Sequence, residues 1–380
     1  MPSLRRAVWL LAVSLIAFTV VRLSSRHSIL GDLAVYRAEG MAIRHNDNLY
    51  AHLEGFHSLG TYPPFAAVMF VTLTLLPFGL VEVLCLIVNV LLLALVCYLG
   101  CRLAGLRGRD ALVPVLVFTA VATWSEPVFT TFAYGQINLL LLALVLWDFT
   151  LPETSRWRGI GTGIAAGWKV TPGILIVYLL ITKRFRAALL AAVTFLGTVA
   201  FSGIFDWHDT WRYWTHYLFQ LSRVGHVENP VNQTVRGLAV RAGQSLHVSP
   251  WVVLLIGLVL IAGLVIAWQA YLRFGDAWGL PAAAVTGLLV SPISWSHHWV
   301  WALPIAIVLW AQTRRWLYAA FAVFMTWCVW YVTWVSHRHW FALNPVEVAG
   351  SGFYILFGLG FLALTAYRWR TEPAPASSDV

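Results

Sequence analysis

Apolar stretches follow one another along almost the whole chain, and they limit the possible folds more than any other feature. Hydrophobic residues make up 60% of the 380 positions, while Asp, Glu, Lys and Arg together make up 11%. An ordinary soluble domain carries roughly 25% charged residues. A soluble fold of this size could not cover its surface with so few charges. The sequence therefore argues against a soluble enzyme, a disordered regulator or a nucleic-acid binder and indicates a membrane protein.

The apolar stretches predict an all-α, polytopic membrane helix bundle. A straight crossing needs about 20 apolar residues. Several stretches are shorter, so we expect broken, re-entrant or buried segments among a total of about 11 to 13. The stretches lie at 7–23, 64–77, 80–101, 111–125, 137–149, 158–168, 171–182, 187–205, 251–273, 279–293, 298–313, 315–334 and 351–368.

The two ends of the chain differ in character. The first apolar stretch follows Arg5 and Arg6 and resembles a signal peptide, but no small-x-small cleavage motif follows it cleanly, which favours a retained first helix. We expect residues 1–372 to form a single integral-membrane domain and residues 373–380 a short disordered cytoplasmic tail.

Basic clusters predict the orientation, because Lys and Arg accumulate on the cytoplasmic side. The net charge of +9 is therefore interpreted as membrane topology. If every basic cluster lies on the cytoplasmic side, 64–77 is re-entrant and 158–182 is split into two arms. Alternatively, 64–77 spans the membrane fully and 102–110 lies on the opposite side. Both arrangements place the same four segments on the extracytoplasmic face. These segments are 24–61, 206–250, 294–298 and 335–350.

Two of these external segments, 24–61 and 206–250, are far longer than ordinary connectors. The second is crowded with Trp, Tyr and His, which is typical of interfacial helices that lie along the lipid headgroups. Anchoring at the interface is also the simplest explanation for this segment.

Asp32 stands at the start of a predicted helix in the first external segment. Its carboxylate could cap that helix by accepting the backbone N–H of Ala34 or Val35. Alternatively, it could act as a general base that removes a hydroxyl proton near the membrane surface. The sequence leaves both roles open.

Polar groups also gather where apolar segments end. Lys169 in so apolar a neighbourhood suggests function, although snorkelling to the interface competes. Tyr62 begins a Tyr-Pro-Pro-Phe turn that could simply be a rigid entry into the membrane. Gln136 and Asn138 flank another segment end.

The segment Ser291–Trp301 contains tandem histidines, His297 and His298, among several tryptophans. Adjacent side chains on a helix point about 100° apart, so the pair is poorly suited to bind one metal ion. Binding a phosphate is more natural, and an aromatic belt with incidental imidazoles is the alternative.

Gly159, Gly163 and Gly167 recur at four-residue spacing before Lys169. Gly161, Gly163 and Ala166 also fit a dinucleotide-binding pattern, but no strand precedes them. The spacing instead predicts a small-residue face for close helix packing.

As an ordered set, these motifs resemble glycosyltransferase family 87 of the membrane-embedded GT-C superfamily. The motifs run from residue 31 to residue 299, with Thr234 where Ser is commoner. They are Gly31-Asp32-Leu33-x-Val35-Tyr36, Leu49-Tyr50, Tyr62-Pro63-Pro64-Phe65, Tyr134-Gly135-Gln136-Ile137-Asn138, Lys169-x-x-Pro172, Asn232-Gln233-Thr234 and the segment from Ser291 to Trp299.

The resemblance implies a polyprenyl-phosphate-linked sugar donor and a glycolipid acceptor that meet at the outer face of the plasma membrane. It implies inverting α-mannosyl transfer to a phosphatidylinositol mannoside, with an α-1,2 linkage, and it assigns the catalytic base to Asp32 and catalytic roles to His297 and His298. No metal or other cofactor is implied. The expected donor-phosphate and substrate-binding residues are Lys169, Tyr62, Gln136, Asn138, Asn232, Gln233, Arg236 and Trp295, with Arg37 a weaker candidate.

Two other classes of function remain open at this point. A transporter or flippase of lipid-linked saccharides would also explain the many spans. An assembly scaffold is the other class, although a scaffold would not need polar residues gathered at the ends of spans. Within the enzyme class, arabinose or glucose could replace mannose.

Overall fold

A computed structural model describes residues 3–24, 30–51, 60–336 and 339–372. Within these ranges the chain is helical and forms no β-strand, and an isolated bridge pairs Asn232 with Trp295. The predicted all-α fold is confirmed. The expected tail at 373–380 lies outside the described residues.

Long apolar helices make the chain a multi-pass membrane protein. In the described ranges, five helical segments are long and apolar enough to cross a membrane, or six if one bent pair is counted as a span. The five are α1 (Leu4–Ser24), α4 (Phe78–Leu103), α10 (Phe185–Phe205), α13 (Pro250–Phe274) and the segment Leu317–Val335, which contains α16 (Leu317–Phe324), η7 (Cys328–Trp330) and α17 (Tyr331–Val335). The bent pair is α5 (Arg109–Ala122) and α6 (Glu126–Tyr134), which meet at 69°.

The remaining bundle helices are mostly shorter, as the short apolar stretches predicted. They are α7 (Asn138–Thr150), α8 (Ile160–Trp168), η2 (Thr171–Gly173), α9 (Ile174–Ile181), α14 (Asp276–Val290), η5 (Ser296–Trp301), α15 (Ala302–Gln312), η6 (Arg314–Trp316) and α19 (Phe353–Thr371). The two arms α8 and α9 break at Lys169, whose backbone is extended. The total of eleven to thirteen membrane segments stays a prediction.

The segment 64–77 is not among the helices long enough to cross a membrane. It forms α3 (Pro64–Phe70) and η1 (Val71–Thr74), which pack against α2 (Gly31–His45). Contact is close at Gly40, where a Cβ atom would lie 2.5 Å from the Phe70 carbonyl oxygen. Eleven residues rise only about 16 Å as a helix, so this segment fits the re-entrant arrangement.

The glycine face of α8 packs against α10 as predicted. A Cβ atom at Gly163 would lie 2.5 Å from the Ala191 carbonyl oxygen, and one at Gly167 would lie 2.1 Å from Thr198 Oγ1. Gly159 also has a φ of +115°, which disfavours other residues. This close packing fixes the end of α8, from which Lys169 extends.

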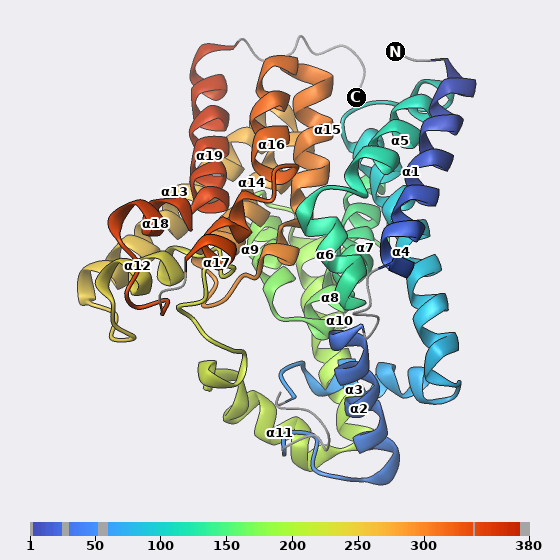
Figure 1. Ribbon diagram of the computed structural model, residues 1–380, viewed down its shortest axis with the longest axis vertical. Coiled ribbons are helices and arrows are strands. Elements are labelled where there is room, and N and C mark those ends of the chain that lie inside the picture. The colour runs from blue at the N-terminus through green and yellow to red at the C-terminus, as the bar shows by residue number, and fades with distance from the viewer. Residues whose placement is uncertain (1–2, 25–29, 52–59, 337–338, 373–380) are drawn as a thin grey trace.

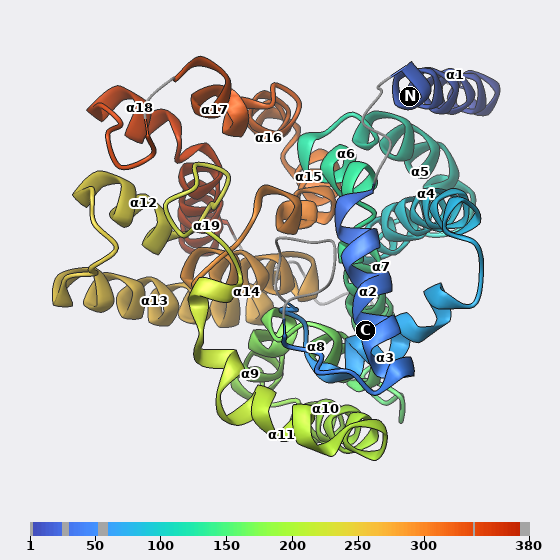
Figure 2. The same cartoon turned by 60° about the horizontal axis from the view of Figure 1, so that its bottom comes forward.

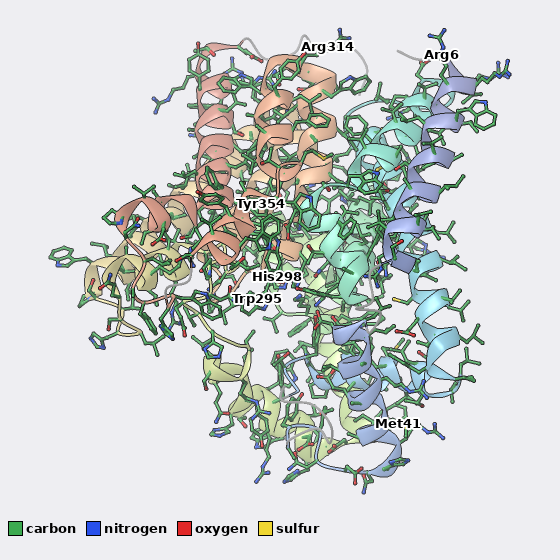
Figure 3. The ribbon with its side chains drawn as sticks, viewed as in Figure 1. Arg6, Met41, Trp295, His298, Arg314 and Tyr354 are labelled. Atoms are coloured by element: carbon green, nitrogen blue, oxygen red, sulfur yellow. The ribbon has the colours of Figure 1, made fainter. Side chains whose placement is uncertain are left out.

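Arg6, near the N-terminus, and Met41 of α2 lie at opposite ends of the molecule. Arg6 and Arg314 lie at the top of Figure 3, Met41 of α2 lies at the bottom, and Trp295 and His298 lie between them. The lower end also carries α3 and α11 (Trp207–Thr215), and α12 (Val235–Gly243) and α18 (Pro345–Gly350) lie to one side (Figure 1). Figure 2 shows α2, α6, α8 and α14 arranged around the centre of the molecule.

Candidate functional site

A cavity of about 990 Å³ lies between the segments predicted to be external and the ends of the bundle helices. Its walls come from α2, the turn after α6, the α8–α9 break, the 206–250 segment and η5. It brings together most of the predicted site residues, which are Asp32, Tyr62, Gln136, Lys169, Trp295, His297 and His298.

Asp32 faces this cavity and does not cap its helix. The N-cap of α2 is Leu30, without a side-chain cap, so the capping alternative is wrong. The Asp32 carboxylate instead accepts a hydrogen bond from Gln136 Nε2. Burial raises the pKa of Asp32, while the bond from Gln136 and the charge of Lys169 oppose this shift.

A network of hydroxyls orients Gln136. Its Oε1 atom accepts from the Tyr36 hydroxyl at 2.8 Å and from the Tyr62 hydroxyl at 3.3 Å, and these two hydroxyls lie 2.8 Å apart. Because Oε1 is occupied by donors, the amide nitrogen points toward Asp32. Gly135, with a φ of +69°, ends α6 and allows the turn that brings Gln136 into position.

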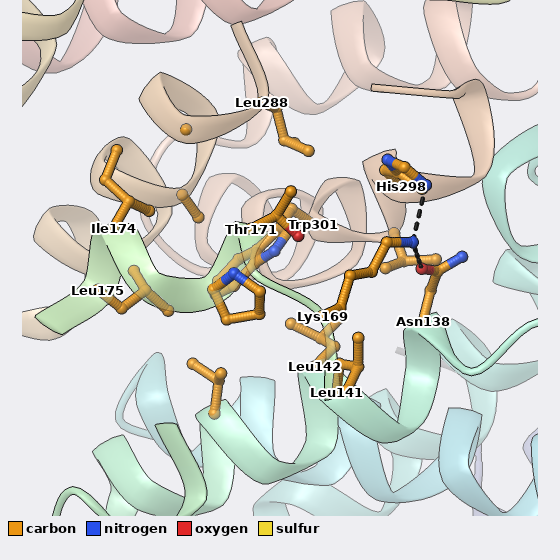
Figure 4. A pocket seen from close by; sticks show the side chains of 15 residues that line it. Asn138, Leu141, Leu142, Lys169, Thr171, Ile174, Leu175, Leu288, His298 and Trp301 are labelled. Atoms are coloured by element: carbon orange, nitrogen blue, oxygen red, sulfur yellow. Dashed lines mark hydrogen bonds between the residues drawn. The ribbon is translucent and has the colours of Figure 1, made fainter. Parts of the chain in front are cut away.

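Lys169 lies at the centre of a second polar group, shown in Figure 4. Its Nζ atom donates to Asn138 Oδ1 at 3.2 Å and lies 2.8 Å from His298 Nε2. The same atom is 5.4 Å from the centre of the Tyr62 ring. Burial lowers the pKa of Lys169 to about 7, and Asp32 opposes that shift. Lys169 is therefore held inside the cavity by neutral partners rather than by a contacting carboxylate.

The tandem histidines differ in their surroundings. His298 pairs with Lys169, whereas neither ring nitrogen of His297 has a hydrogen-bond partner in the described chain. The two rings lie 4.9 Å apart at 81°, and the His297 ring lies edge-on to Tyr134. Burial and the charge of Lys169 lower the pKa of both histidines. His297 thus presents a neutral, unpaired imidazole to the cavity.

Four of the predicted site residues do not line the cavity: Asn138 lines the adjoining cleft, and Asn232, Gln233 and Arg236 line neither space. Asn232 and Gln233 are fully buried, and they hold the backbone near η5: Asn232 Oδ1 accepts from Ser294 N–H at 3.0 Å, and Gln233 Oε1 accepts from Tyr354 N–H at 3.1 Å. Arg236 also lies outside the cavity wall. The weaker candidate Arg37 binds the carbonyl oxygens of Leu73 and Leu76.

One wall of the cavity was not predicted from sequence. Arg223 lies there, donates to the Tyr50 carbonyl oxygen at 2.6 Å and lies 4.6 Å from the centre of the Tyr217 ring. Trp330 and Trp340 contribute aromatic surface. The aromatic composition of 206–250 indicated an interface with lipid headgroups, and nothing in it distinguished Arg223 from a surface cation.

A narrow cleft continues from this cavity between α7, α9 and α14. It shares Lys169 and His298 with the cavity and is otherwise mostly apolar, as Figure 4 shows. Asn138 lies at its polar end. The apolar lining includes Leu141, Leu142, Ile174, Leu175 and Leu288.

Comparison with known proteins gives the family. The model of glycosyltransferase family 87 matches residues 61–292. A polyprenol-phosphate-mannose-dependent alpha-(1-2)-phosphatidylinositol pentamannoside mannosyltransferase of Mycobacterium tuberculosis (strain CDC 1551 / Oshkosh) is 36% identical over 80% of this chain and 72% of its own length. A polyprenol-phosphate-mannose-dependent alpha-(1-2)-phosphatidylinositol mannoside mannosyltransferase of Mycobacterium tuberculosis (strain ATCC 25618 / H37Rv) is 32% identical over 80% of this chain and 75% of its own length. The protein with this same function in Mycolicibacterium smegmatis is 32% identical over 86% of this chain and 80% of its own length.

No solved structure matches the chain significantly. The family match begins after Asp32 and ends before His297, so it does not itself assign roles to those residues. It does cover more than half of the chain, and the relatives above extend the similarity over most of the rest. The chain therefore belongs to glycosyltransferase family 87 and is a membrane glycosyltransferase.

Proposed function

We propose that the protein transfers a mannosyl residue from polyprenyl-phosphate-mannose to a hydroxyl of a phosphatidylinositol mannoside, forming an α-1,2 linkage. The names of its relatives support the donor, the acceptor and the linkage. The observation that carries the mechanism is the arrangement of Asp32 and Lys169, which line one cavity and interact electrostatically without a direct hydrogen bond.

Asp32 acts as the general base. Its carboxylate takes the proton of the acceptor hydroxyl while the oxygen attacks the anomeric carbon. The bond from that carbon to the phosphate oxygen breaks, and the departing polyprenyl phosphate keeps the electron pair. A single displacement on a β-linked donor inverts the configuration and gives the α-glycoside. The raised pKa of Asp32 makes it a stronger base than an exposed aspartate.

Lys169 and His298 hold the departing phosphate. Lys169 Nζ and His298 Nε2 lie 2.8 Å apart where the cavity meets the narrow cleft. The apolar lining of that cleft marks the side from which the polyprenyl chain approaches the phosphate. Donors preorganised in a site that excludes water stabilise developing negative charge strongly. Neither ring nitrogen of His297 is hydrogen-bonded to a described residue, so His297 is available to a sugar hydroxyl or a phosphate oxygen.

The acceptor occupies the opposite wall. Trp295, Trp330 and Trp340 offer aromatic faces for sugar rings, and Arg223 offers a cation for the phosphodiester of the acceptor headgroup. Arg223, Trp295 and Trp340 belong to segments predicted to be external, whereas Trp330 belongs to the apolar stretch 315–334. Arg6 and Arg314 lie at the far end of the molecule, which supports an extracytoplasmic reaction at the plasma membrane.

Purified protein in detergent tests this proposal directly. Radiolabelled polyprenyl-phosphate-mannose mixed with phosphatidylinositol mannosides should yield a larger labelled mannolipid, whose label an α-1,2-specific mannosidase releases. Detergent removes the two compartments that a flippase needs, so product formation excludes transport as the activity. Failure to form product with donors and acceptors of several lengths would contradict the proposal.

A further inference from the structure

Glu126 is a buried carboxylate that the mechanism above does not use. It begins α6 just after the bend from α5, its side chain is fully buried, and it does not line the cavity. An ionisable group in such an apolar position is costly unless it is well bonded, and it therefore points to a role.

Donors from several helical elements converge on this one carboxylate. Oε1 accepts from Ser296 Oγ at 2.6 Å, from Trp330 Nε1 at 2.7 Å and from Thr130 Oγ1 at 2.9 Å. Oε2 accepts from the Tyr354 hydroxyl at 2.7 Å. Hydrogen bonds to charged groups are among the strongest in proteins, so Glu126 joins η5, η7 and α19 to α6.

Two of these hydrogen bonds come from residues that lie at the cavity or next to it. Ser296 immediately precedes His297 and His298, and Trp330 itself lines the cavity. Both donate to the same oxygen, Oε1 of Glu126. Oε1 of Glu126 therefore fixes the distance between the segment that carries His297 and His298 and the cavity residue Trp330.

The other side of the histidine segment is fixed through Tyr354. Tyr354 donates its backbone N–H to Gln233 Oε1, and its ring packs against Trp299, the residue after His298. The backbone N–H of Gln233 in turn donates to the Ser294 carbonyl oxygen at 2.8 Å. A continuous chain of bonds thus runs from Glu126 through Tyr354 and Gln233 to Ser294 and returns through Ser296.

We infer that Glu126 is a positioning residue: it holds the segment from Ser294 to His298 in register with the Trp330 wall, so that His297 and His298 meet the donor phosphate. This inference rests on the proposed function. It assigns no contact between Glu126 and the substrate. A misplacement of about 1 Å can cost roughly 100-fold in rate, so releasing this link should lower turnover more than it lowers affinity.

Two hydroxyls that donate to the same Glu126 oxygen provide a matched comparison. Ser296→Ala removes the bond to the histidine segment, whereas Thr130→Val removes a bond that stays within α6. We expect Ser296→Ala to lower kcat by roughly 30- to 100-fold, with KM for the donor changed by less than about threefold. Thr130→Val should change kcat by less than about threefold. Equal losses in both variants, or no loss in Ser296→Ala, would overturn the positioning role.

Tyr354→Phe keeps the inference testable if Ser296→Ala does not fold. It removes only the hydroxyl on Oε2 and should lower kcat by roughly tenfold, again with little change in KM. An unchanged kcat in folded Tyr354→Phe would count against the role of Glu126. Wild-type turnover in the same assay separates the two proposals: an inactive wild type contradicts the proposed function, whereas an active wild type with unaffected variants contradicts only the positioning role.

Discussion

Lys169 Nζ lies 2.8 Å from His298 Nε2, although the two residues are 129 positions apart in the chain. Lys169 Nζ also donates to Asn138 Oδ1 and lies over the Tyr62 ring, and Asp32 lowers the cost of its charge from a distance. No described carboxylate contacts Lys169, so its protonated form can offer its charge to a ligand, and an anionic ligand favours that form. This pairing is therefore the part of the cavity best suited to an anionic phosphate.

Removing the Lys169 charge should weaken catalysis sharply. We expect Lys169→Met to lower kcat/KM for the donor by roughly 100- to 1000-fold, since it deletes a preorganised donor to the departing phosphate. Lys183, the other lysine of the sequence, is exposed at the turn before α10 and provides the control. Lys183→Met should retain full activity, and equal effects in the two variants would argue against a phosphate site at Lys169.

The two histidines should be separable by double-mutant cycles. Because His298 pairs with Lys169, the losses from His298→Ala and Lys169→Met should be non-additive, with the double variant less impaired than the product of the single effects. His297→Ala lacks that contact and should combine with Lys169→Met nearly additively. Mild and equal losses in both histidine variants would favour an aromatic belt.

Glu39 should make the stability of the protein depend on pH. Its side chain is buried on α2 and accepts from Thr61 N–H at 3.3 Å, and none of the residues that the structure describes hydrogen-bonds to its Oε2 atom. Burial raises its pKa from 4.5 to about 8. The folded state therefore binds the proton of Glu39 more tightly than the unfolded state does, and this free energy is fully present below pH 4.5. As the pH rises from 4.5 toward 8, the free energy of unfolding falls by about 1.4 kcal/mol per pH unit.

Glu39→Gln should remove this dependence, because the amide keeps an acceptor for Thr61 and cannot ionise. Thermal unfolding in detergent should show no difference between variant and wild type near pH 4.5 and a stabilised variant at pH 8. Asp47→Asn, at an exposed position on the same side of the molecule, is the control. A stability difference that does not change with pH would refute an ionisable Glu39.

The glycine face of α8 should tolerate no added methyl group. Gly163→Ala would place a Cβ atom 2.5 Å from a backbone oxygen of α10, which cannot rotate away, so we expect destabilisation of about 1–3 kcal/mol. Gly197→Ala, on α10, has open space around it and should be neutral. Thermal unfolding of the two variants measures the difference. Equal stability would show that the α8–α10 contact is looser than described.

Much of this organisation was predictable from sequence because a membrane allows few kinds of backbone structure. The lengths of the apolar stretches predicted helices, and the glycine spacing predicted a face for close helix packing, though not that α10 would be the partner. The motifs predicted most of the cavity, including Asp32, Lys169 and His298. These features depend on residues that are close in sequence or unusual in composition.

Other roles depend on contacts between distant segments, which one sequence does not reveal. Asn232 and Gln233 were predicted to bind substrate, but their amides are used by Ser294 and Tyr354. Glu126 was overlooked, although a lone acid between two apolar stretches was a usable signal. Arg223 had no local signal, since its place on the cavity wall depends on how the 206–250 segment folds back.

The most direct measurement compares Asp32→Asn with the wild type in transfer from purified donor to purified acceptor. The amide keeps the size and the contact with Gln136 but cannot take a proton, so kcat should fall by roughly 100- to 10,000-fold while donor binding, followed by tryptophan fluorescence, stays within about threefold. The activity of the wild type should decline as the pH falls through the raised pKa of Asp32, because the base must be ionised. Wild-type turnover in Asp32→Asn would contradict the assignment of Asp32 as the base.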